Sequence, residues 1–381
     1  MPTTQTLILS CNTGEGHNSC AKAIKEYYDS IGAPCVIEDG LRFISPGASQ
    51  FLSWGHSYVY RHLPWLFRLG YRYTEQHPCV FHENSPVHRF LTGGIDRLHR
   101  FVLDGGYTAI ICTHVFTSLM VTAMLKKHPM DLATCFVATD YTCSPSTKDS
   151  CLDYYFIPDP DIASDFESPA IPPEKLISSG IPVRQAFYTS LDKAEAKRRF
   201  GIPPTRRHLL MMCGSMGCGP MKQLLKSLSA HTGDWDITVV CGNNSKLEAE
   251  LKKHYVSHSA VHILGYVSDM SALMDSADLC LTKPGGISVS EAAVKSLPMV
   301  FIDAVAGCEE YNRIHFIRKG GARTADTVND LTALCVTLLE DNARRQQLQH
   351  ALAALPRCNA AKLIYETMNP NTEVSHADDH C

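Results

Sequence analysis

The sequence predicts an α/β protein with two doubly wound domains, and three observations support this prediction. The 381 residues suffice for two domains that each bury a core, since a domain usually has roughly 100 to 200 residues. Short apolar runs alternate with helical stretches along most of the chain. The scheme stops near residues 182–190 and then begins again.

Ten apolar runs are predicted to be buried parallel strands, because they are apolar throughout instead of alternating. In the first half they are residues 6–11, 35–38, 109–113, 134–139 and 154–157. In the second half they are residues 208–213, 237–241, 261–264, 279–282 and 299–302. Each run leads into a polar or Gly-containing turn and a helical stretch, which indicates a doubly wound sheet in each half.

The domain boundary is marked by a change in composition. The segment 180–183, Gly-Ile-Pro-Val, is followed by the charged stretch 192–199 and by Gly-Ile-Pro-Pro at 201–204. We therefore predict domains of residues 1–184 and 185–349. The last residues, 369–381, show no periodicity and are expected to be disordered.

Charge and composition exclude several classes of protein. With 35 Lys plus Arg against 39 Asp plus Glu, the chain lacks the basic field that nucleic acid binding requires. We expect no signal peptide. The sequence contains no run of 18 apolar residues, so no transmembrane helix is predicted. The 16 cysteines lie singly, many inside apolar runs, and are expected to be reduced thiols of a cytoplasmic protein. We expect no metal site, although His77, Cys79, His82 and His88 lie close together in sequence.

Two groups in the first half are candidates for proton transfer. The first strand leads into a loop with Gly14, Gly16 and His17, and a helix is expected from about residue 18. Such a loop places backbone N–H groups and a helix N-terminus at the carboxyl edge of the sheet. Asp140 directly follows another strand and is a candidate general base. The structural alternatives are that His17 is a surface residue at a helix start and that Asp140 caps a turn.

The second half contains three segments suited to a nucleoside diphosphate. Gly214, Ser215 and Gly217 follow its first strand, although their spacing matches neither a dinucleotide fingerprint nor a P-loop. The structural alternative for this loop is a simple tight turn. Behind a later strand lie Lys283, Gly285, Gly286, Ser288 and Glu291. The glycines leave room for a diphosphate and Glu291 would accept both ribose hydroxyls, unless Ser288 and Glu291 form a capping box. Glu309, Glu310 and Asn312 are expected in a loop after the next strand, where they would bind a sugar.

The stretch from residue 40 to residue 74 contains no Asp or Glu but is rich in aromatic residues and arginines. This composition suits an anionic membrane surface, where aromatic rings lie at the level of the headgroups. Trp54, Arg61, Trp65 and Arg68 are the predicted membrane contacts. The alternative is an ordinary pair of core helices broken at Pro64.

Five motifs in order resemble the family of monogalactosyldiacylglycerol synthases and processive diacylglycerol glucosyltransferases. They are Asn12-Thr-Gly14-Glu-Gly16-His17, Ala138-Thr139-Asp140, Gly265-Tyr266-Val267-Ser-Asp269, Lys283-Pro-Gly285-Gly286 with Ser290-Glu291-Ala292, and Glu309-Glu310-Tyr-Asn312. The resemblance covers residues 5 to about 365. It implies a GT-B fold with two Rossmann-like domains facing a cleft, the acceptor on the first and the UDP-sugar on the second. It also implies that a final helix, residues 350–368, rejoins the first domain.

The resemblance implies an inverting glycosyltransferase, from family 28, without a metal or other cofactor. It would transfer a hexose from UDP-glucose or UDP-galactose to diacylglycerol at the inner, cytoplasmic face of an anionic membrane. Tyr266 and Val267 join the predicted donor site, and Asp140 is preferred as base with His17 donating a hydrogen bond to phosphate or acceptor. Cys308 stands where many relatives have Gln, which bears on the choice of sugar. The competing hypotheses are a UDP-sugar epimerase of the same fold and a catalytically silent UDP-sugar sensor.

Overall fold

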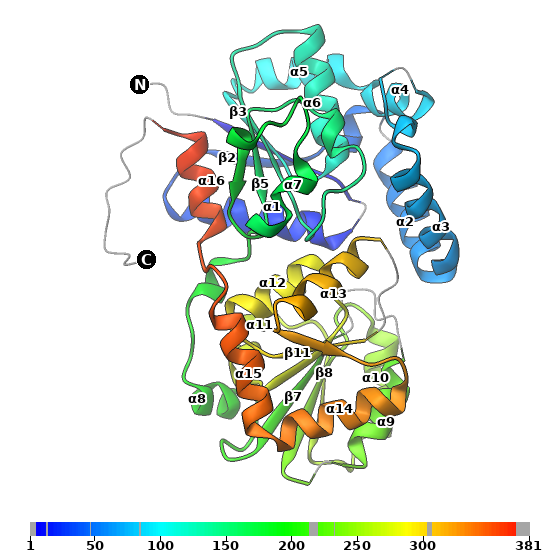
Figure 1. Ribbon diagram of the computed structural model, residues 1–381, viewed down its shortest axis with the longest axis vertical. Coiled ribbons are helices and arrows are strands. Elements are labelled where there is room, and N and C mark those ends of the chain that lie inside the picture. Colours follow the sequence, from blue (N-terminus) through cyan, green and yellow to red (C-terminus); the bar gives the residue numbers. More distant parts are fainter. Residues whose placement is uncertain are drawn as a thin grey trace. The chain divides into compact units, whose positions relative to one another are not determined.

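The computed structural model describes residues 5–12, 14–45, 47–83, 85–212, 220–231, 233–302 and 307–370. The chain divides into two compact units (Figure 1). Unit 1 comprises Met1–Gln185 and Arg357–Cys381, and unit 2 comprises Ala186–Pro356. The predicted boundary lies between residues 184 and 185.

Unit 1 is built on a parallel sheet with the strand order β2-β1-β3-β4-β5-β6. Its strands are β1 (Thr6–Ser10), β2 (Cys35–Asp39), β3 (Ala109–Cys112), β4 (Ala133–Val137), β5 (Tyr154–Ile157) and β6 (Leu176–Ser178). The order reverses beside β1, so right-handed crossovers place helices on both faces of the sheet. The predicted strands of the first half are thus confirmed as β1 to β5.

Eight described α-helices belong to unit 1 and frame its sheet (Figure 1). They are α1 (Glu15–Ser30), α2 (Ala48–His62), α3 (Pro64–Gln76), α4 (Pro86–Thr92), α5 (Ile95–Asp104), α6 (Val115–Lys127), α7 (Ala163–Phe166) and α16 (Ala360–Met368). Short 3₁₀ helices are η1 (Gly40–Phe43), η2 (Pro78–Val80), η3 (Thr147–Asp149), η4 (Pro160–Ile162), η5 (Pro173–Lys175) and η6 (Gln185–Tyr188), the last spanning the junction of the units. The core packs Leu7, Leu9, Ile110, Phe136 and Tyr155 from the strands against these helices.

Unit 2 has a second parallel sheet, with the order β12-β11-β10-β7-β8-β9. Its strands are β7 (Arg207–Met212), β8 (Trp235–Val240), β9 (Val261–Leu264), β10 (Leu279–Thr282), β11 (Met299–Phe301) and β12 (Ala322–Thr324). Its helices are α8 (Lys193–Arg199), α9 (Met221–Ser229), α10 (Ser245–His254), α11 (Met270–Ser276), α12 (Gly286–Val294), α13 (Cys308–Arg318), α14 (Val328–Glu340) and α15 (Asn342–Ala353). The predicted strands of the second half are confirmed as β7 to β11.

The expected final helix of residues 350–368 is wrong in one respect, because two helices occupy that region. α15 ends at Ala353 in unit 2, and α16 begins at Ala360 in unit 1. Pro356 lies between them. A proline has no N–H to donate to the helical hydrogen bond, and its ring disfavours the helical conformation in the residue before it.

α16 packs on α1 (Figure 1). The ring of Tyr365 lies 5.0 Å from that of Tyr28 and 5.9 Å from that of Tyr27. Asn369 is buried behind the helix, and residues 371–381 of the expected disordered tail lie outside the described residues.

Candidate functional site

The two candidates for proton transfer lie at the carboxyl edge of the sheet in unit 1. His17 belongs to the first turn of α1, which follows β1, and Asp140 follows β4 after Ala138 and Thr139. β3 lies between β1 and β4 and pairs with both, so these residues share one region of the edge. The half-buried side chain of Asp140 belongs to this edge.

His17 lies in a helix, whereas a loop was expected, since α1 begins at Glu15 and not at residue 18. The helix start is favoured because Glu15 places a negative charge at the positive end of the helix dipole. Gly14 is the N-cap residue, with an extended backbone and no side-chain cap, and Gly16 lies inside the first turn. The loop prediction was wrong for Gly16 and His17.

The ring of His17 is held by residues that follow two neighbouring strands, β3 and β4. Its Nδ1 lies 2.9 Å from the carbonyl oxygen of Thr113 and 3.0 Å from the hydroxyl oxygen of Thr139. A carbonyl oxygen only accepts, so Nδ1–H donates to Thr113 and the lone pair of the neutral ring resides on Nε2. A base oriented by a third group in this way is the arrangement found in activated catalytic pairs.

His114 is a part of this site that the sequence analysis did not identify. It is buried, its ring lies 4.4 Å from that of His17, and the two rings meet edge to face. Its Nδ1 accepts a hydrogen bond of 3.0 Å from the backbone N–H of Phe116 and so caps α6. The sequence feature that could have identified His114 is its position directly after the predicted strand 109–113, because residues there lie at the carboxyl edge of the sheet.

In unit 2, β10 leads into α12 through Lys283, Pro284 and Gly285. α12 begins at Gly286 with Gly285 as N-cap and no side-chain cap. Ser288 and Glu291 therefore lie inside the helix. Because Ser288 is not the N-cap residue, the two residues do not form the capping box that was the structural alternative. Both side chains are half-buried, and Lys283 is buried.

The neighbouring strand β11 precedes α13, which packs against α12. Glu309, Glu310 and Asn312 lie in this helix, so their predicted placement in a loop was wrong. α13 begins after Gly307, whose φ of 64° favours glycine, and the two glutamates stabilise the first turn. The amide of Asn312 donates a 3.0 Å hydrogen bond to the carbonyl oxygen of Pro284, which ties the starts of α12 and α13 together.

The remaining donor candidates lie farther along the sheet or outside the described residues. Tyr266 and Val267 follow β9, which lies three strand positions from β10, about 14 Å at the usual strand spacing. The side chain of Tyr266 is exposed and that of Val267 is half-buried. Gly214, Ser215 and Gly217 fall in the segment 213–219, which the described residues do not include.

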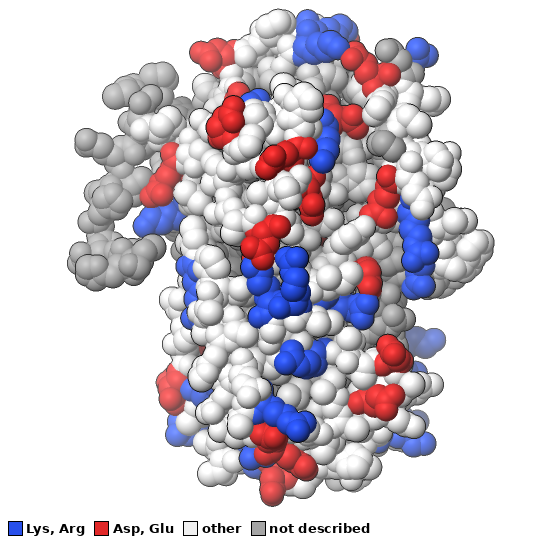
Figure 2. Space-filling model, in the orientation of Figure 1, with Lys and Arg blue, Asp and Glu red and all other residues white. Residues whose placement is uncertain are grey.

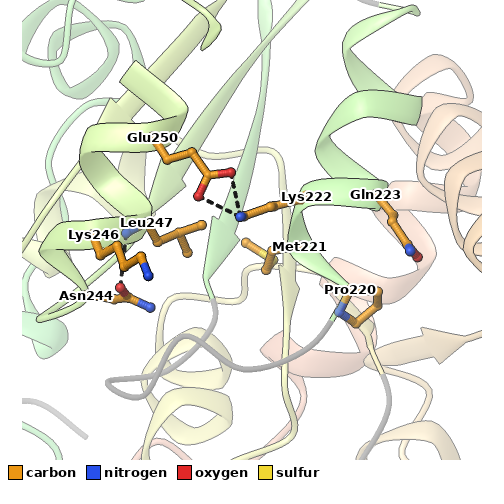
Figure 3. A pocket seen from close by; sticks show the side chains of 8 residues that line it. All are labelled: Pro220, Met221, Lys222, Gln223, Asn244, Lys246, Leu247 and Glu250. Carbon is orange, nitrogen blue, oxygen red and sulfur yellow. Dashed lines mark hydrogen bonds and ion pairs between the residues drawn. The ribbon is translucent and has the colours of Figure 1, made fainter. Parts of the chain in front are cut away.

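A polar pocket of about 430 Å³ lies between the starts of α9 and α10 (Figure 3). Its lining is Pro220, Met221, Lys222, Gln223, Asn244, Lys246, Leu247 and Glu250. Both carboxylate oxygens of Glu250 bind the ammonium group of Lys222, at 2.5 and 2.6 Å (Figure 3). None of the predicted site residues that the structure describes is among these lining residues.

Ion pairs hold the segment before β7 to the rest of unit 2. Lys193 and Lys197 on α8 both bind the carboxylate of Asp278, each at 2.9 Å. Burial raises the pKa of Asp278, but the two lysines outweigh burial and hold this pKa at about 2. Next to it, burial lowers the pKa of His208 to about 4, and its ring nitrogens contact the hydroxyl groups of Thr238 and Ser276.

The acid-free stretch forms the helical hairpin of α2 and α3, joined at Leu63 with Pro64 opening α3. The exposed fraction is 65% for Trp54 and 64% for Trp65, and Arg68 is also exposed. Other exposed apolar side chains on the hairpin are Phe51, Tyr58, Leu66, Leu69 and Tyr73. The surface over α2 and α3 is mostly white in Figure 2. An ordinary pair of core helices would bury these side chains.

Arg61 lies in α2, but its side chain is outside the described part of the structure.

Among the described residues, no helix combines the length and the apolar character that a membrane span needs. Within the same described residues, no group of three or more His, Cys, Asp and Glu side chains is arranged to hold a metal ion. The cysteines that the structure describes are free thiols, most of them buried.

Two family models match consecutive parts of the chain. Residues 17–183 match the model of monogalactosyldiacylglycerol (MGDG) synthase, and residues 208–366 match the glycosyltransferase family 28 C-terminal domain. A processive diacylglycerol beta-glucosyltransferase of Bacillus cereus strain AH187 is 26% identical over 365 residues, which cover 95% of this chain and 92% of the relative.

Solved structures resemble the chain over nearly its whole length. MurG of Acinetobacter baumannii has a TM-score of 0.62 at 12% identity and covers 97% of this chain and 100% of its own. A UDP-GlcNAc 2-epimerase from Neisseria meningitidis, bound to UDP-GlcNAc, has a TM-score of 0.61 at 15% identity with the same coverage. At these identities the likeness shows the fold alone, and it confirms the prediction of two α/β domains of the GT-B type.

Proposed function

The chain belongs to the family in which an MGDG synthase domain precedes a glycosyltransferase family 28 C-terminal domain, and from this premise we propose that it transfers a hexose from a UDP-sugar to diacylglycerol. UDP-glucose and UDP-galactose are the proposed donors. The proposed place of action is the inner, cytoplasmic face of an anionic membrane, to which the protein binds peripherally.

The observation that carries this proposal is the exposed aromatic face of α2 and α3 on the same unit as the oriented His17. A lipid acceptor requires both a group that takes its proton and a surface that meets the bilayer. Trp54, Trp65 and Arg68 suit such a surface, because aromatic rings favour the headgroup region and Arg binds phosphate. A UDP-sugar epimerase or a silent sensor needs no lipid surface, so this face favours transfer.

His17 is the proposed general base. With Nδ1–H donated to Thr113, the Nε2 lone pair of His17 is suited to take the proton of the glycerol hydroxyl. This reverses the preference for Asp140, because the hydrogen bond to Thr113 assigns the tautomer of His17 and leaves Nε2 as its basic nitrogen. The hydroxyl would attack the anomeric carbon from the face opposite the diphosphate, which inverts that carbon.

The start of α12 is the proposed donor site. Backbone N–H groups at Gly285 and Gly286 and the helix dipole would stabilise the departing UDP, and Glu291 would accept the ribose hydroxyls. Lys283 and the residues Gly214, Ser215 and Gly217 would add to diphosphate binding. Tyr266 and Val267 are proposed for the base of the nucleotide, and Glu309, Glu310 and Asn312 for the sugar. In this mechanism, helix N-termini stabilise the negative charge that develops on the leaving group.

Incubation with single UDP-sugars tests the proposal. The pure protein is mixed with vesicles of diacylglycerol and phosphatidylglycerol and with one of several UDP-sugars, and the lipids are analysed by mass spectrometry. We expect a hexosyldiacylglycerol with a β-linkage, as inversion of an α-linked donor requires. Conversion of the UDP-sugar to an epimer without any glycolipid would instead support the epimerase, and UDP-sugar binding without turnover would support the sensor.

A further inference from the structure

The carboxylate of Asp39, at the end of β2, joins two parts of unit 1 that have different proposed tasks. Its Oδ2 accepts a 2.8 Å hydrogen bond from the amide of Asn12, in the segment between β1 and α1. The same oxygen accepts a hydrogen bond from the hydroxyl of Ser49, in the first turn of α2. Its Oδ1 accepts a 3.1 Å hydrogen bond from the backbone N–H of Leu41 in η1.

On one side, Asp39 is connected to the helix turn that carries His17. Asn12 accepts a 2.8 Å hydrogen bond from the amide of Asn18, the residue next to His17. The oxygen of the Asn18 amide accepts in turn a 2.7 Å hydrogen bond from the hydroxyl of Ser10, at the end of β1. This chain of hydrogen bonds fixes the first turn of α1, and His17 with it, relative to the sheet edge.

On the other side, Asp39 is connected to the aromatic hairpin. Ser49 is buried, but Phe51, two residues later in α2, has an exposed fraction of 70%. The segment between Asp39 and α2 is held as well, because the guanidinium of Arg97 donates to the carbonyl oxygens of Phe43 and Ile44. The exposed face of α2 and the residue that binds Asp39 therefore lie within one turn of the same helix.

We propose that Asp39 is a positioning residue through which contact of α2 with a lipid surface fixes the helix turn that carries His17. The inference rests on the proposed membrane function. Because Asn12 and Ser49 donate to the same oxygen, the position of that oxygen depends on both. A shift of α2 on binding lipid therefore changes the bond to Asn12 and, through Asn18, the start of α1.

Three variants separate this coupling from general folding. Asp39→Asn keeps the size of the side chain but replaces one acceptor oxygen by a donor. Ser49→Ala keeps the carboxylate and removes the donor of α2. Glu38→Gln is the matched control, since Glu38 neighbours Asp39 in β2 but pairs with Arg42, at 2.6 Å, outside the network.

Hydrogen exchange measured by mass spectrometry is the first readout, with and without vesicles of phosphatidylglycerol. In the unaltered protein we expect vesicles to slow exchange both in the hairpin and in residues 10–20. In Asp39→Asn and Ser49→Ala we expect slower exchange in the hairpin only, while Glu38→Gln behaves like the unaltered protein. The second readout is the ratio of turnover on diacylglycerol in vesicles to turnover on a short-chain diacylglycerol dispersed in water. Loss of coupling should lower this ratio by about 2- to 30-fold.

The exchange readout requires no transfer reaction, so its failure is distinct from failure of the proposed function. The inference is overturned if vesicles leave residues 10–20 unchanged in the unaltered protein, or protect them equally in Asp39→Asn and Ser49→Ala. It is also overturned if both variants lose vesicle binding, because Asp39 would then serve only to fold the hairpin. Coupled exchange without any glycolipid product would support the inference and contradict the proposed transfer.

Discussion

The Nδ1 atom of His17 lies 2.9 Å from the carbonyl oxygen of Thr113. This distance joins the first turn of α1 to the residue that follows β3. The hydrogen bond requires the proton on Nδ1, and a neutral His17 then keeps its lone pair on Nε2. The proposed role of His17 in proton transfer depends on this tautomer.

We expect His17→Ala to lower the turnover number by a factor on the order of 10² to 10⁴, the usual worth of a general base. The affinity for UDP, measured by calorimetry, should stay near its original value, because the proposed UDP site lies in unit 2. Asp140→Asn, which is nearly the same size, should retain most of the turnover. If Asp140→Asn abolishes transfer while His17→Ala retains it, the base is Asp140.

Glu291→Ala should weaken UDP binding by about 1.5 to 3 kcal/mol, since Glu291 is proposed to accept hydrogen bonds from the ribose as a charged group. The melting temperature should change little, because α12 begins at Gly286 and Glu291 does not cap it. Glu250→Ala is the control, since Glu250 lies on α10 in the polar pocket. Equal UDP affinities of Glu291→Ala and the unaltered protein would contradict the ribose role.

The hairpin of α2 and α3 should bind anionic vesicles more strongly than neutral ones, and less at high salt, because salt screens the arginines. The triple variant Trp65→Ser, Arg61→Glu and Arg68→Glu should sediment poorly with vesicles. A control with the same change of charge, Leu103→Ser with Lys252→Glu and Lys253→Glu, alters an exposed apolar residue and two lysines outside the hairpin. Similar sedimentation of both variants would show that the hairpin is not the membrane contact.

Asp278→Asn should lower the free energy of unfolding by about 3 to 5 kcal/mol, because removing one partner leaves a buried charge unpaired. The charge in question is Lys197, whose side chain is 5% exposed and binds Asp278 at 2.9 Å. Chemical denaturation measures the change. Glu250→Gln, which breaks the solvent-exposed pair with Lys222, should leave the unfolding free energy almost unchanged. A similarly small effect of Asp278→Asn would mean that Lys197 finds another partner.

His208 should make the stability of the protein depend on pH. Burial lowers its pKa from 6.5 to about 4, so the unfolded chain binds more protons between these values. The free energy of unfolding should therefore fall as the pH is lowered, by about 2 kcal/mol between about pH 7.5 and about pH 5. His208→Gln should reduce this dependence in urea titrations at the two pH values. An unchanged pH dependence would show that other groups cause it.

The central strands were predictable because they are buried on both faces and therefore apolar throughout. β6 and β12 were missed, since each has only three residues and lies at the end of its sheet, where no other described strand pairs with its outer side. The helix starts of α1 and α13 were misplaced as loops. In both, a glycine is the N-cap residue and the first turn is acidic, with Glu15 in α1 and Glu309 and Glu310 in α13. Helix formation there depends on backbone conformation and on the helix dipole.

The position of a candidate residue at the sheet edge was predictable where the residue follows a predicted strand directly. Asp140 and Lys283 belong to this class. His114 and Asp39 also follow or end strands, but their importance arises from contacts with residues far away in the sequence. His114 meets His17 across 97 positions, and Asp39 meets Asn12 across 27. Such pairs are created by the order of the strands in the sheet, which one sequence does not reveal.

The order of the units along the chain has a consequence for biosynthesis. Unit 2 is inserted between Gln185 and Arg357, so the ribosome makes all of it before α16. Until then the faces of Tyr27 and Tyr28 that meet Tyr365 stay uncovered on the nascent chain. Unit 1 is thus begun before unit 2 and completed after it. Apolar surface exposed on an incomplete domain favours aggregation, so unit 1 is open to chaperone binding until α16 has been made.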